Sequence, residues 1–381
     1  MKILLVINSL EGGGAERVAC TLARHWDASG HDVTIITLHG GPIAYEVPDS
    51  VKLHSLESRR LLLGPGRLAA MPVGAYELAA FIKRLEPDAT ISFLARANLV
   101  HVLTRMFGNQ HPIYISERSF SEAEYVGPRR VVGAMVKRLY PFSTQIIAIS
   151  KGVRESLGRM GVPLDKITTV YNPQNLAEIR AEAWQEKQRP PNAPFRIVMS
   201  GRLAEPKDYE TLLKSLAILR LDKKLDVRLV VVGDGPDKVR LHERSRALGI
   251  AEHVEWKGWT SKVHAVVGGC DAFTFASTWE GFGNVLVEAM ACGLPIVATD
   301  CPSGPAEILE NGKYGFLVPM KDAKAIADAV ADLMTKPEVY ADYKRRALEG
   351  AERFDVETIS ARYLEIMTSV SPADQPALAP S

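Results

Sequence analysis

Two basic residues in the second half of the chain have the types and spacing to bind a diphosphate. Residues 201–208 (GRLAEPKD) place Arg202 and Lys207 five positions apart, directly after a strand-like apolar run. An arginine offers a rigid bidentate fork and a lysine a mobile point charge, and both suit phosphate oxygens. A pair of solvated surface cations is the alternative interpretation of the same residues.

Two glutamates farther along the chain could bind a sugar. Residues 280–288 (EGFGNVLVE) contain a pliant glycine loop followed by a helical pattern that begins near Asn284. Glu280 precedes this expected helix and Glu288 lies more than one turn inside it. Carboxylates in these places can accept hydrogen bonds from sugar or ribose hydroxyls, while the free N–H groups of the helix start stabilise phosphate charge. Glu280 could equally be an acid that only satisfies the helix dipole.

A third candidate lies near the N-terminus. Residues 12–17 (GGGAER) follow the first strand-like run and open a helix, so backbone N–H groups there could approach a phosphate. The spacing departs from G-x-G-x-x-G, and His39 and two glycines stand where a ribose-binding acid would follow the second strand. The loop is the only feature that would support a nicotinamide-dependent oxidoreductase. The other interpretation of the loop is a tight turn that binds no ligand.

Short apolar runs alternate with amphipathic stretches along the whole chain, which is typical of βαβ units and parallel sheets. The runs lie at residues 3–7, 33–38, 89–93, 113–116 and 146–149, and then at residues 196–200, 227–233, 254–257, 272–275, 296–298 and 316–318. This pattern predicts an α/β protein of two successive doubly wound domains. We expect a first domain over residues 1–180, a linker over 181–194 and a second domain over 195–355. A helix over 356–370 should return to the first domain, and a disordered tail should follow over 371–381.

The composition is that of a globular enzyme. The 381 residues suit two domains of ordinary size, with 46% hydrophobic and 24% charged residues. No apolar run reaches the roughly 18 residues that span a bilayer, and the opening MKILLVINSL reads as a strand rather than a signal peptide. Four scattered cysteines form no C-x-x-C pair, so neither a disulfide framework nor a zinc site is indicated. A cytoplasmic enzyme is expected.

The net charge of +1 hides an asymmetry. Residues 51–170 carry 17 lysines and arginines against 9 acidic residues, whereas the rest of the chain carries 29 against 36. Within the basic region, residues 129–139 (RRVVGAMVKRL) combine apolar residues with four cations, Arg129, Arg130, Lys137 and Arg138. Such a stretch can rest on an anionic membrane or hold a lipid diphosphate, and a buried helix with solvated ends is the alternative.

The order of these motifs resembles one enzyme family. The glycine-rich turn, Gly-Arg-Leu-x4-Lys, the GDGP of residues 233–236 and Glu-x7-Glu occur in the order found in the retaining family-4 glycosyltransferases. Residues 150–153 (SKGV), 171–173 (YNP) and 293–298 (GLPIVA) extend the resemblance from Lys2 to about residue 370. It implies a GT-B fold, with two Rossmann-like domains that face a cleft, the first binding the acceptor and the second the nucleotide sugar. It also implies catalysis without a cofactor or metal, and the chain contains no Asp-x-Asp.

The same resemblance assigns roles to residues. Arg202 and Lys207 would neutralise the leaving diphosphate, Glu280 would orient the transferred sugar, and Glu288 would hold the ribose. Many members of the family have histidine where this chain has Arg118, and an arginine cannot act as a general base at neutral pH. The full set of expected donor-binding residues is Gly13, Gly14, Arg118, Asn172, Gly233, Trp259, Phe282, Gly283, Asn284 and Glu288.

Two further segments, residues 300–308 (DCPSGPAEI) and 115–118 (ISER), are similar to a bacterial branch that adds N-acetylgalactosamine or galactose to undecaprenyl-diphosphate-linked glycans. The resemblance to this branch implies a UDP-sugar donor, a lipid-linked saccharide acceptor and no nucleic acid partner. It also implies a peripheral position on the anionic inner face of the cell membrane. A sugar-nucleotide 2-epimerase of the same architecture is the alternative that would use the same donor without a lipid acceptor.

Overall fold

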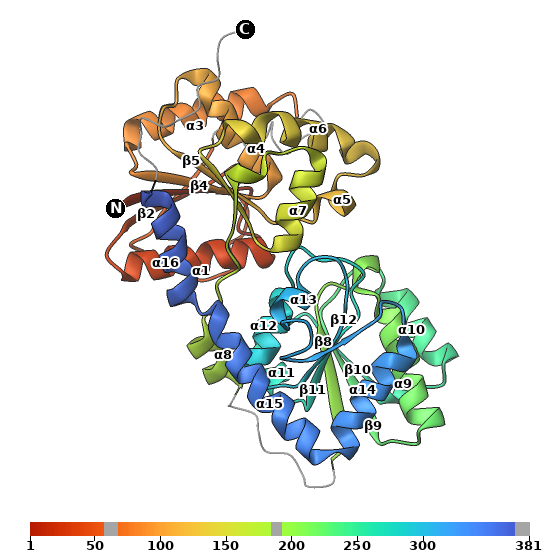
Figure 1. Cartoon of the computed structure of the whole chain (residues 1–381). Coiled ribbons are helices and arrows are strands. Elements are labelled where there is room, and N and C mark those ends of the chain that lie inside the picture. Colours follow the sequence, from red (N-terminus) through yellow and green to blue (C-terminus); the bar gives the residue numbers. More distant parts are fainter. Residues whose placement is uncertain (57–67, 184–192, 370–381) are drawn as a thin grey trace. The chain divides into compact units, whose positions relative to one another are not determined.

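The computed structural model of the chain describes residues 1–56, 68–183 and 193–369, which form two compact units (Figure 1). The first unit comprises Met1–Gln174 together with the chain from Val356 on, and the second comprises Asn175–Asp355. Most of the expected linker and the expected tail lie outside the described residues. Within the described residues, no helix has both the length and the apolar character needed to cross a membrane.

The first unit is built on a seven-stranded parallel sheet of order β3-β2-β1-β4-β5-β6-β7. Its strands are β1 (Lys2–Ile7), β2 (Asp32–Thr37), β3 (Lys52–Ser55), β4 (Ala89–Phe93), β5 (Ile113–Glu117), β6 (Gln145–Ala148) and β7 (Ile167–Thr169). The order reverses between the neighbours β1 and β4, whose carboxyl ends are level because Ile7 pairs with Phe93. Ligands of doubly wound folds bind at such a switch point.

Helices cover both faces of this sheet. They are α1 (Gly14–Ala28), α3 (Met71–Leu85), α4 (Ala95–Leu103), η1 (Thr104–Phe107), α5 (Ser121–Glu124), η2 (Gly127–Arg129), α6 (Arg130–Leu139), η3 (Tyr140–Phe142), α7 (Lys151–Met160), η4 (Leu164–Lys166) and α16 (Val356–Thr368). Local chemistry starts some of them, as at α7, where the Ser150 side chain accepts a hydrogen bond from the Val153 N–H.

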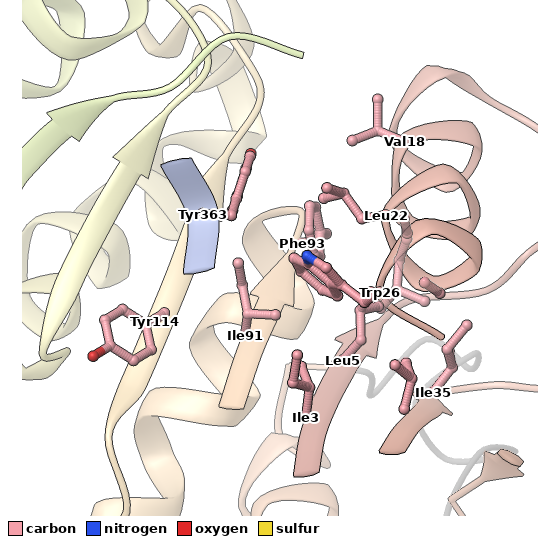
Figure 2. Close-up of a cluster of buried hydrophobic side chains, with 14 of the residues drawn as sticks. Ile3, Leu5, Val18, Leu22, Trp26, Ile35, Ile91, Phe93, Tyr114 and Tyr363 are labelled. Atoms are coloured by element: carbon pink, nitrogen blue, oxygen red, sulfur yellow. The ribbon is translucent and has the colours of Figure 1, made fainter. Parts of the chain in front are cut away.

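The last helix of the described chain packs into the core of the first unit. Figure 2 shows Tyr363 of α16 and Trp26 of α1 among side chains of the central strands, including Ile91 and Phe93. The rings of Trp26 and Tyr363 meet edge to face with centroids 6.4 Å apart. The Tyr114 hydroxyl donates to the Met367 carbonyl at 3.1 Å. Residues far apart in sequence therefore share one core.

The second unit repeats the plan with a six-stranded parallel sheet of order β10-β9-β8-β11-β12-β13. Its strands are β8 (Phe195–Ser200), β9 (Val227–Val232), β10 (Val254–Gly258), β11 (Ala272–Phe275), β12 (Ile296–Thr299) and β13 (Phe316–Val318). Its helices are α8 (Leu176–Ala183), η6 (Glu205–Lys207), α9 (Tyr209–Ala217), the π-helical η7 (Ile218–Asp222), α10 (Lys238–Ala247), η8 (Ala251–His253), α11 (Val263–Gly268), α12 (Asn284–Ala291), α13 (Pro305–Ile308), α14 (Ala323–Thr335), α15 (Pro337–Ala351) and η9 (Glu352–Phe354).

The expected fold class of two doubly wound parallel sheets is confirmed. Each apolar run named above became a strand, but two strands were not anticipated. All four residues of β3 are exposed, so this edge strand has no apolar run to reveal it. The other, β7, is only three residues long, which is too short for periodicity to show.

Candidate functional site

The loops at the carboxyl edge of the second sheet are joined by direct backbone contacts. The Leu203 N–H donates to the Asp234 carbonyl at 3.0 Å, which ties the loop after β8 to the loop after β9. A Cβ on Gly233 would lie 2.0 Å from the Gly201 carbonyl oxygen, and one on Gly235 would lie 2.3 Å from that of Leu203. The glycines are needed because the two backbones touch.

An ion pair joins two of the three predicted catalytic residues. Lys207 Nζ lies 2.5 Å from Glu280 Oε1, and the Ser277 hydroxyl donates to the same oxygen at 2.7 Å. Both side chains are largely withdrawn from solvent, with 22% of Lys207 and 13% of Glu280 exposed. The Thr278 N–H also donates to the Pro206 carbonyl at 2.8 Å. The loop after β8 and the loop after β11 are therefore held together.

The third predicted catalytic residue, Arg202, is exposed on the same loop as Lys207. Across residues 1–56, 68–183 and 193–369, its side chain forms no hydrogen bond or ion pair. Its guanidinium is thus available to an anionic ligand at this edge of the sheet.

Burial and the Glu280 charge keep nearby acidic groups protonated. Burial raises the pKa of the Cys301 thiol, and the neighbouring Glu280 raises it further. The same two causes raise the pKa of Tyr209, whose hydroxyl donates to the Gly201 carbonyl at 3.0 Å. Neither group is prepared to act as a nucleophile.

The helix after Glu280 begins at a glycine with positive φ. Gly283 (φ 102°) precedes the first residue of α12, Asn284. The Phe282 ring is buried against Phe354, with centroids 5.5 Å apart, so its side chain belongs to the core. Of the predicted donor-binding positions here, Phe282 can offer a ligand only its backbone.

The other predicted glutamate, Glu288, is buried in α12 and faces a histidine that sequence reasoning missed. His264 Nε2 lies 3.6 Å from Glu288 Oε2, and His264 Nδ1 lies 2.6 Å from Glu182 Oε2. Burial by itself lowers the pKa of His264, but Glu288 and Glu182 outweigh it and raise the pKa above its ordinary value. No local motif could have revealed this cluster, because its members lie on three separate helices.

Trp259 is 76% exposed and follows the last residue of β10. The carbonyl of that residue, Gly258, accepts a hydrogen bond from the Gly233 N–H at 2.8 Å. Two predicted donor-binding positions, Trp259 and Gly233, are therefore adjacent at this edge.

In the first unit, the glycine-rich turn leads into α1 at the switch point. The Gly13 N–H donates to the Tyr45 hydroxyl at 3.1 Å, and that hydroxyl donates to the Gly13 carbonyl at 3.0 Å. The Arg17 guanidinium lies over the Tyr45 ring, 5.4 Å from its centroid. A phosphate at Gly13 would have to replace Tyr45, whereas Gly14 opens the helix itself. The sequence did not indicate Tyr45.

Two other predicted residues of this unit meet in its interior. Arg118 is 8% exposed, and its guanidinium donates to Asn172 Oδ1 at 2.5 Å and to Ser116 Oγ at 3.2 Å. The same group lies over the Phe93 ring, 5.3 Å from its centroid. Burial lowers the pKa of Arg118, an effect that Tyr363 and Glu16 oppose. The side chain is a desolvated cation with neutral hydrogen-bond partners.

The residue before Arg118 is a buried carboxylate that sequence reasoning did not single out. Glu117 accepts hydrogen bonds from the N–H groups of Arg118 and Ser119 at 3.0 and 3.1 Å. The hydroxyls of Tyr140 and Tyr125 also donate to it, at 2.6 and 3.2 Å. Burial raises the pKa of Glu117 although these hydrogen bonds oppose the shift. The network holds the loop that carries Arg118.

The four cations of the basic stretch are exposed on η2 and α6, and Arg129 forms an ion pair with Glu124. Val126 and Val131, beside them in sequence, are also exposed, at 54% and 58%. Gly133 and Val136 are the buried residues of α6. This surface therefore combines positive charge with accessible apolar side chains.

Comparisons with known proteins agree with this architecture. The profile described as "Glycosyltransferase Family 4" matches residues 12–178, and that described as "Glycosyl transferases group 1" matches residues 180–349. The chain belongs to the GT-B glycosyltransferases.

Several curated relatives of this glycosyltransferase are known by name. One is the N-acetylgalactosamine-N,N'-diacetylbacillosaminyl-diphospho-undecaprenol 4-alpha-N-acetylgalactosaminyltransferase of Campylobacter jejuni, 29% identical over 93% of this chain and 96% of its own length. Another is the lipopolysaccharide core biosynthesis glycosyltransferase LpsE of Rhizobium meliloti, 25% identical over 94% of this chain and 96% of its own length.

Solved structures share the fold. Anabaena Alr3699/HepE, determined in complex with UDP, has a TM-score of 0.77 and 21% identity, covering 97% of this chain and 100% of its own. The sucrose-phosphate synthase of Thermosynechococcus elongatus has a TM-score of 0.78 and 19% identity, covering 96% of this chain and 98% of its own. At these identities the likeness establishes the fold.

The close contact between the loops after β8 and β9 predicts that Gly233→Ala destabilises the second unit. An alanine there would meet the Gly201 carbonyl and would keep an unfavourable φ of 134°. We expect the second unit to lose about 2–3 kcal/mol of unfolding free energy. Gly249→Ala is the matched control, because φ is 68° there but no atom lies within 4 Å, and it should cost only about 1 kcal/mol.

Urea unfolding of both variants would give the two costs. Hydrogen exchange of peptides covering residues 200–207 would show whether the loop after β8 loosens in Gly233→Ala alone. Equal destabilisation by the two substitutions would contradict the close-contact explanation.

Proposed function

We propose that this glycosyltransferase moves a hexose or N-acetylhexosamine from UDP onto a saccharide linked to a lipid diphosphate, with retention of anomeric configuration. N-acetylgalactosamine or galactose is the proposed sugar. The observation that carries the proposal is the Lys207–Glu280 ion pair beside the exposed Arg202 at the carboxyl edge of the second sheet. The proposal assigns the diphosphate to the two cations and the sugar to the carboxylate of Glu280.

The second unit would bind the donor. Arg202 and Lys207 would face the diphosphate, and the backbone N–H groups at the start of α12 would add partial positive charge. Lys207 and Ser277 both contact Oε1 of Glu280, so Oε2 remains to accept a hydrogen bond from a sugar hydroxyl. Glu288 would hold the ribose.

In the proposed reaction the bond between the sugar C1 and the diphosphate oxygen breaks, and a bond from C1 to the acceptor oxygen forms on the same face. The acceptor's hydroxyl proton passes to the departing diphosphate oxygen. We propose that protein cations, rather than a metal ion, neutralise the charge that develops on the leaving group. The absence of Asp-x-Asp from the sequence supports this.

The first unit would bind the acceptor. The Campylobacter jejuni relative named above acts on a diphospho-undecaprenol glycan, which supports a lipid-diphosphate acceptor here. Exposed cations and valines around α6 would contact an anionic membrane, so the protein would be peripheral on the inner face of the cell membrane. Arg118, which follows β5 and lies over Phe93 at the end of β4, would bind phosphate or a sugar hydroxyl.

A panel of nucleotide sugars tests the proposed function directly. The enzyme is incubated with each donor and with membrane extract, and release of UDP or GDP is followed together with glycolipid products. UDP-N-acetylgalactosamine or UDP-galactose should be preferred, and a preference for GDP-mannose would contradict the proposed donor. Free 2-epimer as the product would contradict transfer.

If Arg202 and Lys207 neutralise the leaving diphosphate, removing either cation should greatly lower turnover. Arg202→Ala and Lys207→Ala should each lower kcat about 10²–10³-fold, with the milder loss at Lys207, because it supplies one point charge rather than a fork. Lys214→Ala, which removes an ion pair with Glu210 on α9, should leave kcat unchanged. Wild-type turnover should survive a chelator, and its loss on chelation would contradict metal-independent transfer.

The exposed cations of α6 predict salt-sensitive membrane binding. Each basic residue that reaches an anionic surface contributes roughly 1 kcal/mol, and salt screens the attraction beyond about 8–10 Å. Reversing Arg129, Arg130, Lys137 and Arg138 to glutamate should therefore abolish co-sedimentation with anionic vesicles. Reversing four exposed cations of the second unit should not, and the matched set is Lys324, Lys336, Lys344 and Arg345. Undiminished binding of the first variant would exclude this surface as the membrane contact.

A further inference from the structure

Three side chains of the second unit form a carboxylate–imidazole–carboxylate cluster, which we call the His264 cluster. Glu182 comes from α8, His264 from α11 and Glu288 from α12. Nδ1 of His264 lies 2.6 Å from Glu182, and Nε2 lies 3.6 Å from Glu288. The exposed fractions of the His264, Glu288 and Glu182 side chains are 13%, 8% and 25%, so the imidazole and Glu288 are largely shielded from water and Glu182 less so.

The geometry favours a protonated imidazole. The short contact of Nδ1 with a carboxylate requires a proton on Nδ1. In a neutral ring the Nε2 lone pair would then face the second carboxylate, whereas in the imidazolium both N–H groups face negative charge. Within the described residues, Nε2 is buried without a hydrogen-bond partner. Protonation of Nε2 therefore creates an electrostatic attraction to Glu288, 3.6 Å away. The raised pKa of His264 agrees with this arrangement.

The other charged groups of the packed elements are engaged elsewhere. On α8, Arg180 pairs with Glu352, and Glu178 accepts a hydrogen bond from the Asn175 side chain at 3.0 Å. On β8, Arg196 pairs with Glu255 at 2.9 Å. On α12, Glu288 is the titratable residue. The Cys292 thiol, just after α12, contacts the His264 backbone carbonyl at 4.0 Å rather than the ring. The protonation of His264 therefore depends chiefly on Glu182 and Glu288.

We infer that protonated His264 is a positioning residue that holds the Glu288 carboxylate for the ribose of the nucleotide, so that nucleotide affinity falls when His264 loses its proton. Glu182 holds the ring from its other side. This inference rests on the proposed role of Glu288 in ribose binding.

The direction of the pH dependence follows from the charges. Below the pKa of His264, one positive charge lies between two negative ones, and Glu288 is anchored. Above that pKa, two carboxylates remain in a shielded cluster without the imidazolium, and Glu288 loses its attraction to His264. Because the pKa of His264 is raised, the transition lies above the ordinary histidine value of about 6.5.

Binding of UDP measured by calorimetry from about pH 5.5 to about pH 9 tests the inference, since histidines titrate in this range. The terminal phosphate of UDP also titrates near its lower end. The 2′,3′-dideoxy analogue of UDP shares that phosphate but lacks the ribose hydroxyls, so the difference between the two ligands isolates the ribose. For wild type, the preference for UDP over the analogue should fall as pH rises.

The variants give the sharper result. His264→Gln should reduce the preference for UDP at low pH and make it independent of pH. Glu182→Gln keeps the imidazole but removes one of its negative neighbours, so the transition should move to lower pH. His253→Gln is the matched control, because His253 also lies beside a carboxylate, 3.5 Å from Glu252, and should leave the profile unchanged.

A spectroscopic measurement separates positioning from a merely structural role. The imidazole signals of His264 in the NMR spectrum of the full chain should titrate above the ordinary pKa, and UDP should raise that pKa further. A rise of one pKa unit on binding corresponds to about a tenfold difference in UDP affinity between the two protonation states. If UDP leaves the titration of His264 unmoved, the inference is overturned, even where His264→Gln alters folding.

The outcomes also distinguish this inference from the proposed function. If neither UDP nor GDP binds at any pH, the proposed nucleotide-sugar donor is wrong, and the inference falls with it. If UDP binds but its pH profile is the same in wild type and His264→Gln, only the inference is wrong.

Discussion

The ion pair between Lys207 and Glu280 is the contact on which the carboxyl edge of the second sheet depends. It joins the loop after β8 to the loop after β11, although 73 residues separate its two partners. Both side chains are mostly withdrawn from solvent, so removing either one would leave a charge with poor solvation. A backbone hydrogen bond links the loop after β11 to the loop after β12, because the Glu280 N–H donates to the Pro302 carbonyl at 3.3 Å. Charges held in this way need little rearrangement when a ligand arrives, which is how preorganised sites stabilise a transition state.

In the first unit, the buried charges of Arg118 and Glu117 are held by hydrogen bonds rather than by an ion pair between them. Arg118 and Glu117 are adjacent in sequence and both buried, yet their side chains have separate sets of partners. The guanidinium is met by an amide, a hydroxyl and an aromatic face, and the carboxylate by two backbone N–H groups and two tyrosine hydroxyls. A buried cation in a region of low dielectric attracts an anion strongly, and the charges of Glu16 and Glu117 already act on Arg118 in this way. This is consistent with a phosphate-bearing substrate in the proposed reaction.

The two units share a plan but are completed differently. Each has a parallel sheet whose strand order reverses beside its first strand, so each gathers loops at one edge. The first unit adds α16, which lies more than 180 residues beyond the rest of that unit and supplies Tyr363 and Met367 to its core. Tyr363 also lies beside Arg118 closely enough to affect its pKa. The chain's last described helix is therefore part of the environment of a candidate site residue.

The sequence alone determined the fold class, nearly all strands and the loops that carry the candidate chemistry, because apolar runs and glycine-rich motifs are local signals. It also indicated Arg202, Lys207 and Glu280, since loops at the carboxyl ends of parallel strands must gather at one edge. Only the tertiary structure decided that Lys207 contacts Glu280, that the Tyr45 hydroxyl hydrogen-bonds to Gly13, and that His264 lies between Glu288 and Glu182. These contacts join residues from separate elements, and no spacing along the chain encodes them. They depend on how helices and loops pack over the sheet. The strands β3 and β7 escaped the apolar pattern for other reasons, because β3 is exposed and β7 is only three residues long.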